Sequence, residues 1–524
     1  MASIIEYDYV IVGGGTAGCV LAHRLTKDPN ISVLVIEGGP NDQKLDSVLQ
    51  LKNWINLLNG PLDYSYPTTE QARGNSHIIH SRAKVLGGCS SHNTLISFFP
   101  FPEDLDDWVQ AGATGWEWES FKMYAQRVKS HIQPVAKKDQ NSLAAAFIDA
   151  TQKALHLPRI NDYAQWVKTG GHSPWREGVG WLSVAYHPET GTRSSASVAY
   201  VHDILGKRKN LTVWFEAWAC KLVLPGQNKT VTGVHVLLKN GNKVFVKAAK
   251  EVCLCAGAVD SPRLLLLSGI GPRKQLEDLN IPVLHDLPGV GENLLDHPET
   301  IIMWKTGPQP LQTVMKSEVA YFNRRSVASD SRPDMMSHIY QIPFAENTER
   351  LGYPRPEQAF CVTPNIPRPK SKGRLYLTSR DPQVKPALDF QYFTDPEDYD
   401  AKVLVDGIKQ ARLIAQAEPF KSWLLEEVAP GPLVQSDTDL NLYARKASHT
   451  VYHPAGTCKM GAPNDPMSVV DPYLKVKGLK NIRVIDASIF PTMISVNPMI
   501  TVMMIAEKAS DLILKDYYAT SSKL

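Results

Sequence analysis

One stretch near the start of the chain constrains the fold more than any other: YVIVGGGTAGCVLAHRL, followed shortly by ISVLVIE. The two apolar runs are typical of buried parallel strands, and the segment between them has the apolar spacing of a helix. Gly13, Gly15 and Gly18 match G-x-G-x-x-G, whose glycines allow a tight turn, a close approach to a pyrophosphate and close helix–strand packing. Glu37 ends the second strand, where an acid accepts hydrogen bonds from a ribose hydroxyl. The pattern predicts a Rossmann-type dinucleotide-binding unit and does not separate NAD from FAD.

Length and charge limit what can be built around this unit. The chain has 524 residues, more than a single hydrophobic core usually supports, so we expect two domains or one large composite domain. Hydrophobic residues make up 43% and charged residues 21%, which is typical of a globular protein. A net charge of +3 is too small, at this length, to favour binding to nucleic acid or to a membrane surface. The apolar runs are also too short to cross a bilayer.

The cysteines and the two chain ends predict where the protein works. Seven scattered cysteines, an odd number with no pair at zinc-site spacing, predict reduced thiols in an intracellular protein and no metal site. The start MASIIEYDYVIVGGG shows no secretory signal before the first strand. The last three residues, Ser522-Lys523-Leu524, match a receptor-read peroxisomal address. We therefore expect a peroxisomal protein that binds the import receptor through this tripeptide.

Five further stretches carry a family resemblance. They are SRAKVLGGCSSHN, AGAVDSPRLLLLSGIGP, LPGVGENLLDHPE, VYHPAGTCKMG and VIDASIFPTMISVNPMITVMMIAEKASDLI. Together with the glycine motif, they resemble the landmarks of the glucose-methanol-choline (GMC) oxidoreductases and fall in that family's order from Tyr7 to about Leu514. Within the family, GGCSSHN, DHPE, PDMMSHIYQIPF and TVYHPAGT are most similar to the choline-oxidising members.

The resemblance implies a fold of the α/β class. A Rossmann-type FAD-binding domain is joined to a discontinuous α+β substrate domain with an antiparallel sheet, the GMC fold. The FAD-binding domain would take residues 1–150, 188–298 and 451–524, and the substrate-binding domain residues 151–187 and 299–450. The active site would lie where the two domains meet. The family likeness also suggests a homodimer.

The resemblance also implies FAD as the cofactor. His92 falls where the choline-oxidising members bond a histidine covalently to the flavin. A neutral imidazole is a competent nucleophile toward the 8-methyl carbon of the flavin, and the small residues of GGCSS let the ring come near. The alternative is a histidine that only packs beside the ring. The residues expected to contact the cofactor are Gly13, Gly15, Thr16, Ala17, Gly18, Glu37, His92, Asn93, Asp486, Ala487 and Pro498.

Three residues match the family's catalytic positions. His453, in VYHPAG, is assigned to proton transfer and to stabilising alkoxide charge, because a histidine poised near neutrality suits the removal of an alcohol proton. Asn497, in SVNP, is expected to hydrogen-bond the substrate oxygen and to help orient the flavin. His338, in MMSHIYQIPF, matches a second histidine that hydrogen-bonds the substrate hydroxyl. Without the resemblance, His453 would be interpreted as a turn histidine and His338 as a core histidine.

Glu299 indicates the substrate. By the resemblance it holds the permanent cation of choline, because a carboxylate buried without a cationic ligand is strongly unfavourable. Trp54 and Phe344 match two aromatics of a cage whose ring faces attract the cation, and each such contact contributes about 2 kcal/mol when desolvated. Val451 matches an apolar residue beside the flavin that favours reaction with oxygen, and Thr94 stands where the relatives have a serine.

The chain departs from that pattern at Ser317. Lys316 and Ser317 stand where the choline-oxidising members have a pair of tryptophans, so one cage wall is missing or is supplied by another aromatic such as Tyr340 or Tyr321. The expected function is FAD-dependent oxidation of choline to betaine aldehyde and on to glycine betaine, with O2 as acceptor and H2O2 as product. The partners are thus a small-molecule alcohol and O2. The alternatives are an oxidase of another primary alcohol, aliphatic or aromatic, and a noncatalytic flavoprotein.

Overall fold

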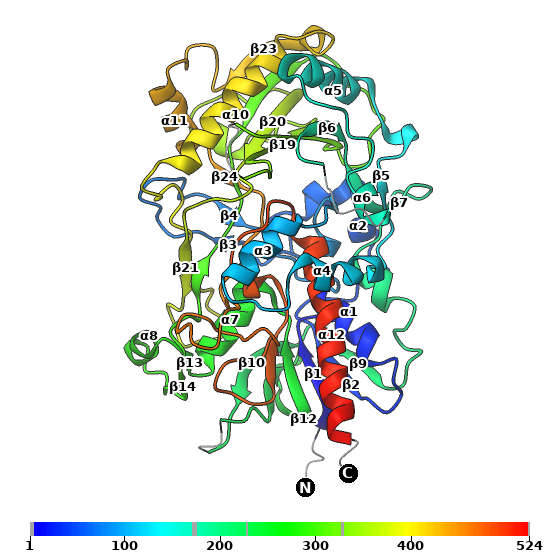
Figure 1. Ribbon diagram of the computed structural model, residues 1–524, viewed down its shortest axis with the longest axis vertical. Helices are drawn as coiled ribbons and strands as arrows, with labels where there is room; N and C mark the ends of the chain where they lie inside the picture. The colour runs from blue at the N-terminus through cyan, green and yellow to red at the C-terminus, as the bar shows by residue number, and fades with distance from the viewer. Residues whose placement is uncertain (1–4, 170–174, 227–228, 326–329, 522–524) are drawn as a thin grey trace.

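Two large sheets, one above the other in Figure 1, organise the molecule. The computed structural model describes residues 5–169, 175–226, 229–325 and 330–521. The seven-stranded sheet lies in the lower half of the figure, near both ends of the chain, and the eight-stranded sheet lies in the upper half. This mixed α/β arrangement confirms the predicted fold class.

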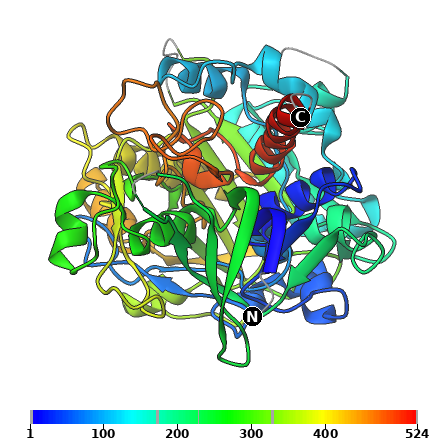
Figure 2. The same ribbon diagram turned by 90° about the horizontal axis from the view of Figure 1, so that it is seen from below.

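The seven-stranded sheet contains the unit that the glycine motif predicts. β1 (Ile5–Val12) and β2 (Val33–Ile36) pair in parallel, with α1 (Thr16–Leu25) between them in the chain. All four residues of β2 are buried, as expected of a strand covered on both faces. α12 (Met499–Ser521) packs along α1 (Figure 1, Figure 2). The remaining strands follow the order β10-β11-β12-β1-β2-β9, with β25 beside β12: β9 (Leu211–Trp214), β10 (Trp218–Val223), β11 (Gly233–Leu237), β12 (Lys243–Leu254) and β25 (Ile482–Val484).

The eight-stranded sheet is antiparallel throughout. α5 (Ser142–Leu155) and α10 (Tyr399–Ala415) pack against it and against each other in the upper part of Figure 1. Its strands follow the order β23-β17-β20-β19-β18-β6, with β16 joining β20 to β24: β6 (Gly178–Trp181), β16 (Pro298–Glu299), β17 (Ile302–Thr306), β18 (Val319–Asn323), β19 (Met335–Tyr340), β20 (Ala359–Asn365), β23 (Leu424–Ala429) and β24 (His449–Thr450).

The chain passes between the two sheets several times. The first sheet takes its strands from residues 5–36, 211–254 and 482–484, and the second takes its strands from residues 178–181 and 298–450. The domain boundaries expected from the sequence stay a prediction. In the described ranges, no helix is both long and apolar enough to cross a membrane.

The other elements are short and connect these layers. The helices are α2 (Asp46–Leu49), α3 (Pro102–Gln110), α4 (Trp118–Phe121), α6 (Gln165–Lys168), α7 (Gly257–Leu267), α8 (Arg273–Asp278), α9 (Glu346–Arg350) and α11 (Asp437–Lys446). The strands are β3 (Tyr66–Pro67), β4 (Ile79–His80), β5 (Ile132–Pro134), β7 (Ser183–His187), β8 (Thr192–Arg193), β13 (Ile270–Gly271), β14 (His285–Asp286), β15 (Glu292–Leu294), β21 (Gly373–Tyr376) and β22 (Ala387–Asp389).

Candidate active site

A cavity reaches from the first sheet to the second. Val12 at the end of β1 and Ile36 at the end of β2 line one part of it, and His338 and Tyr340 of β19 line another. Residues from distant parts of the chain close it, which is typical of a small-molecule site between domains.

The glycine motif packs too tightly for side chains. Gly13 has φ of +99°, and a Cβ placed on it would lie 2.6 Å from the carbonyl oxygen of Cys255. A Cβ on Gly18 would lie 2.0 Å from the carbonyl oxygen of Gly13, so helix α1 can approach β1 only with glycine there. The first residues of α1 line the cavity, and the free N–H groups at the start of a helix favour an anion such as a pyrophosphate. Four predicted residues of the motif line the cavity: Gly13, Gly15, Thr16 and Ala17. Gly18, also predicted to contact the cofactor, does not line it, because its position is used for packing against Gly13.

The side chain of Glu37 is held rigidly at the end of β2. Its two carboxylate oxygens accept hydrogen bonds from the backbone N–H groups of Gly14, at 2.9 Å, and Gly39, at 2.7 Å. Burial raises the pKa of Glu37 to about 7, and the two N–H donors oppose that rise. A fixed acid lining the cavity here fits the ribose of a dinucleotide.

Asp486 lines the cavity two residues after β25 ends. It accepts hydrogen bonds from the Ser261 hydroxyl, at 2.6 Å, and from the backbone N–H groups of Gly257, at 2.9 Å, and Ser488, at 2.8 Å. Ala487 and Pro498 line the cavity beside it. With the close-packed glycines and the fixed acid at Glu37, these residues fit FAD.

His92 lies on the cavity wall in a defined protonation state. Its Nε2 is 2.9 Å from the carbonyl oxygen of Leu57, which can only accept, so Nε2 carries the hydrogen. Burial lowers the pKa of His92 to about 4, so the ring is neutral and its lone pair is on Nδ1, 3.4 Å from the Ser81 hydroxyl oxygen. Asn93 and Thr94 follow it along the same wall.

His453 contacts a histidine that sequence reasoning missed, His297. The two Nδ1 atoms are 2.9 Å apart. The Nε2 of His297 lies 2.8 Å from the carbonyl oxygen of Pro367 and 3.0 Å from that of Ile494, so it must donate. Burial lowers the pKa of His297, so the ring is neutral and its Nδ1 accepts. His453 therefore donates from Nδ1 and keeps its lone pair on Nε2.

The backbone of His453 is fixed by Asp296, a second residue missed in the sequence. The Asp296 carboxylate accepts from the His453 N–H at 3.0 Å and from the Tyr392 hydroxyl at 2.6 Å. Arg82 donates to the carbonyl oxygen of Tyr452, whose φ is +62°. Burial lowers the pKa of His453 well below its usual value, with His297 and Arg82 adding to that effect, so the ring is neutral. The expectation of a histidine poised near neutrality is therefore wrong for this site, because burial disfavours the charged imidazolium.

The other two predicted catalytic residues, His338 and Asn497, line the same cavity as His453. His338 is buried in β19, and its Nε2 has no hydrogen-bond partner among the described residues. Burial lowers the pKa of His338 to about 3. Asn497 and Val451 also line the cavity. Two neutral imidazoles and one amide thus converge on the same space.

Glu299, in β16, is buried and does not line the cavity. It is 1% exposed, and no described residue makes a well-formed hydrogen bond to either carboxylate oxygen. The Thr363 side chain interacts with the carboxyl and lowers its pKa, but less than burial raises it. Burial raises the pKa of Glu299 well above its usual value. The charge of Glu299 in turn raises the pKa values of Tyr340 and Tyr452, after the larger effect of their own burial. Both tyrosines line the cavity, whereas Glu299 does not.

Aromatic rings form one side of this region. The rings of Trp54 and Tyr340 have centroids 6.0 Å apart, and those of Tyr340 and Phe344 are stacked at 4.9 Å. Trp54 lines the cavity, and Phe344 lies behind Tyr340. His338 and Tyr340 share a face of β19 because side chains two positions apart point the same way.

The structure selects between the two aromatics considered for the missing wall. Tyr340 lines the cavity, whereas Tyr321 does not and has its ring centroid 6.3 Å from that of Phe147. Ser317 is also buried away from the cavity, and its hydroxyl has no partner in the part of the chain that is described. The substitution at Ser317 therefore leaves Tyr340 as the aromatic at the wall.

Comparison with known proteins places these features in a family. Two models of the GMC oxidoreductase family match the chain, over residues 7–299 and 369–506. Choline oxidase of Arthrobacter globiformis is 41% identical over 528 residues, which cover 97% of this chain and 94% of that protein. Oxygen-dependent choline dehydrogenase of Photobacterium profundum is 34% identical, covering 97% and 93%. The crystal structure of pyridoxine 4-oxidase from Mesorbium loti superposes with a TM-score of 0.87 at 27% identity, covering 96% and 98%.

These relatives correct one expectation. The two choline-oxidising relatives come from bacteria, which have no peroxisomes, so the predicted peroxisomal location is wrong. A three-residue match carries little information on its own. Ser522-Lys523-Leu524 lie outside the described residues.

The family assignment joins the sequence motifs to the geometry. The matching models cover both the glycine loop and the segment that holds His453 and Asn497. The chain belongs to the GMC oxidoreductase family and is a FAD-dependent oxidoreductase acting on alcohol-type donors.

Proposed function

We propose that the protein is a choline oxidase. It oxidises choline to betaine aldehyde and then, through the aldehyde hydrate, to glycine betaine. Each step transfers two electrons to one O2 and yields one H2O2. The observation that carries this proposal is the carboxyl group of Glu299, which is buried without a cationic partner among the described residues and makes no well-formed hydrogen bond there.

The environment of Glu299 favours a permanent cation. An ionised carboxylate without a partner is unstable in a buried site, and burial raises the pKa of Glu299 for that reason. A quaternary ammonium group cannot donate hydrogen bonds, so it must be held by charge and by ring faces. Trp54 and Tyr340 supply such faces at the cavity, and each contributes about 2 kcal/mol when desolvated.

The histidines supply the acid–base chemistry. When bound, FAD accepts a hydride from the alcohol carbon. The lone pair on His453 Nε2 can take the hydroxyl proton, because Nδ1 is committed to His297. Asn497 can donate its amide hydrogen to the developing alkoxide, and His338 has a free Nε2 for the same oxygen. Two neutral donors and one base thus stabilise the charge as it forms.

Covalent attachment of FAD through His92 belongs to the same proposal. The ring is neutral, as a nucleophile must be, and it lies on the cavity wall within the GGCSS loop. A bond from Nδ1 would displace the contact with the Ser81 hydroxyl, and a bond from Nε2 would displace the contact with the carbonyl oxygen of Leu57. In either case one C–H bond of the 8-methyl group and the imidazole N–H bond would break, and the two hydrogens with two electrons would pass to O2 as H2O2. The apolar side chain of Val451 supports O2 as the electron acceptor.

A second candidate is an oxidase of another primary alcohol. It is favoured by the position of Glu299, which does not itself line the cavity, and by Ser317, which adds no aromatic wall. An uncharged alcohol would need no carboxylate, and Glu299 would then stay protonated. The domain segments and the homodimer expected from the resemblance are proposed with either substrate.

One experiment separates the candidates. Choline, betaine aldehyde and 1-hexanol are added anaerobically to the purified holoenzyme, and the flavin absorbance is followed. Fast bleaching by choline but not by hexanol supports the choline oxidase. Fast bleaching by hexanol alone contradicts it and supports the second candidate. Re-admitting air then tests O2 as acceptor, since an oxidase recovers its absorbance within seconds and releases H2O2.

A further inference from the structure

The segment that carries Asn497 is held by side chains from distant parts of the fold. We call residues 490–498 the Asn497 loop; it leads directly into α12. The Asn293 amide donates to the carbonyl oxygen of Pro491 at 3.3 Å, and the Trp108 indole N–H donates to that of Thr492 at 3.1 Å. These contacts fix the start of the loop.

Ser495 is the most strongly held residue of the Asn497 loop. It is 1% exposed, and its hydroxyl donates to Asp104 Oδ1 at 2.6 Å. The same hydroxyl oxygen accepts from Arg368 Nη1 at 2.8 Å. The Ser495 backbone N–H donates to Asp104 Oδ2 at 3.0 Å. Three hydrogen bonds to charged groups, two of them fully buried, thus hold one residue two positions before Asn497.

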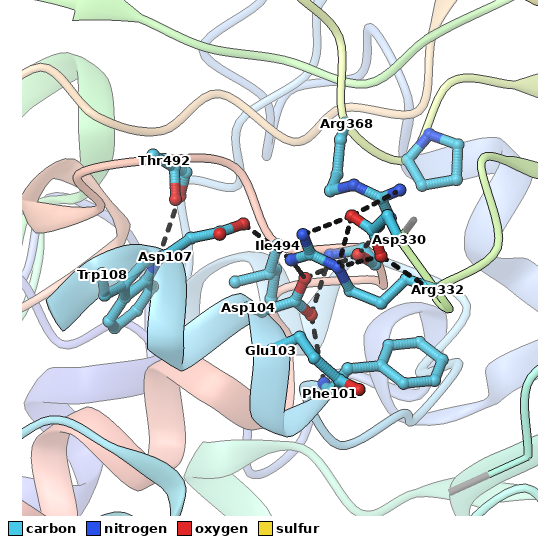
Figure 3. A network of polar contacts seen from close by, with 12 residues as sticks. Phe101, Glu103, Asp104, Asp107, Trp108, Asp330, Arg332, Arg368, Thr492 and Ile494 are labelled. Atoms are coloured by element: carbon cyan, nitrogen blue, oxygen red, sulfur yellow. Dashed lines mark hydrogen bonds and ion pairs between the residues drawn. The ribbon is translucent and has the colours of Figure 1, made fainter. Parts of the chain in front are cut away.

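The groups that hold Ser495 form a larger charged cluster (Figure 3). Asp104 belongs to α3, and Arg332 binds it at 2.9 Å. Arg332 also binds Asp107 of α3 at 2.7 Å and Asp330 at 2.6 Å. Arg368 also forms an ion pair with Asp330, with 3.5 Å between Arg368 Nη2 and Asp330 Oδ2. The cluster therefore joins α3 to two loops that flank strands of the eight-stranded sheet.

The cluster sets the geometry of its members more than it adds net stability. Asp104 is fully buried, and removing such a charge from water offsets most of the attraction to Arg332. A planar guanidinium and a carboxylate do, however, restrict each other's orientation strongly. Asp104 can therefore present its two oxygens to Ser495 in one arrangement.

We propose that Ser495, anchored by Asp104 and Arg368, is a positioning residue that places the amide of Asn497 at the alcohol oxygen. The inference rests on the proposed role of Asn497. Val496 separates the two residues and is itself buried, so a shift of Ser495 passes along the backbone to Asn497. Pro498 restricts the backbone on the other side of Asn497, with φ fixed by its ring.

The test compares Ser495→Ala with two matched variants. Ser495→Ala removes both hydroxyl contacts. We expect the limiting rate of anaerobic flavin reduction in the holoenzyme to fall by about tenfold, because a small displacement of the Asn497 amide from the alcohol oxygen slows the reaction. The dissociation constant of the alcohol should change by less than about threefold. Ser495→Thr keeps the hydroxyl and should restore most of the rate.

Asp107→Asn is the control for the charge of the cluster. Asp107 binds Arg332 as closely as Asp104 does, but no contact joins it to the Asn497 loop among the described residues. We expect Asp107→Asn to reduce flavin within about threefold of the wild-type rate. Equal slowing in Asp107→Asn and Ser495→Ala would overturn the inference, because the effect would then follow the charge cluster and not the loop.

A double-mutant cycle distinguishes positioning from a general structural effect. If Ser495 acts through the Asn497 amide, Ser495→Ala should cause no further loss in the Asn497→Ala background. A full tenfold loss in both backgrounds would overturn the inference. If Asn497→Ala reduces flavin at the wild-type rate, the proposed role of Asn497 fails first. If Asn497→Ala is slow and Ser495→Ala is not, only the positioning inference fails.

Discussion

The ring of His297 fixes the tautomer of His453. The hydrogen of His297 is on Nε2, where it faces two carbonyl oxygens, so His297 Nδ1 accepts the hydrogen bond from His453 Nδ1 and leaves the lone pair of His453 on Nε2. His297→Ala removes the acceptor at His453 Nδ1 and lets that imidazole rotate or change tautomer. We expect anaerobic flavin reduction by the alcohol to slow by about 10- to 100-fold, measured by stopped-flow absorbance.

The control for this prediction is His297→Gln. The glutamine amide oxygen can accept from His453 Nδ1 while its NH2 group donates to the carbonyl oxygen of Pro367 or Ile494. This variant should keep most of the wild-type rate. An unchanged rate in His297→Ala would show that the tautomer of His453 does not depend on its neighbour.

The raised pKa of Glu299 predicts how choline binding depends on pH. Burial raises that pKa, so below it the carboxyl is neutral and attracts no cation. Choline affinity should therefore rise with pH through the raised pKa and level off above it. The dissociation constant, measured by flavin difference spectra with an unreactive quaternary ammonium ligand from pH 6 to 10, checks this. Glu299→Gln should bind weakly at every pH, and a pH-dependent Glu299→Gln would assign the titration to another group.

At the scale of elements, two glycines of the same motif have different tasks. A Cβ on Gly18 would lie 2.0 Å from the backbone oxygen of Gly13, whereas a Cβ on Gly15 would lie 3.7 Å from its nearest neighbour. Gly18→Ala should therefore force α1 away from β1 and destabilise the fold by about 1–3 kcal/mol, even without FAD. Gly15→Ala should leave the apoprotein's thermal midpoint unchanged and weaken only FAD binding. Equal loss of apoprotein stability in both variants would contradict this division.

The same elements show how far the sequence could predict the structure. The strand–helix–strand unit was predictable because its glycines and apolar runs act on near neighbours. The side of the cavity made by Tyr340 was harder to predict, since it depends on the register of β19 against β18 and β20. Phe344 lies beyond the end of β19, so alternation along the strand does not set its direction.

The parts of the site that depend on long-range contacts were not predictable. His297 stands in the quoted DHPE stretch, but nothing local shows that it meets His453, 156 residues away. Arg332 and Asp104 are separated by 228 residues. Single-sequence patterns contain no record of such pairs. The sequence therefore predicted candidate residues such as His453 and Asn497, but it missed His297 and Asp296, whose contacts set the proton and the backbone position of His453.

At the scale of the whole molecule, the cavity reaches from one sheet to the other, so bound FAD should stabilise the folded state of both sheets. A ligand that binds only the folded state adds about 2.7 kcal/mol of stability at a hundredfold excess over its Kd. If FAD is bonded to His92, it cannot leave, and added FAD should not change the wild-type Tm. In His92→Ala, FAD can dissociate, and the Tm should rise with added FAD. Acid precipitation gives the second readout: a yellow wild-type pellet and a colourless His92→Ala pellet. If the wild-type pellet is colourless and its Tm also rises with FAD, the covalent bond is contradicted, while the FAD site between the two sheets remains.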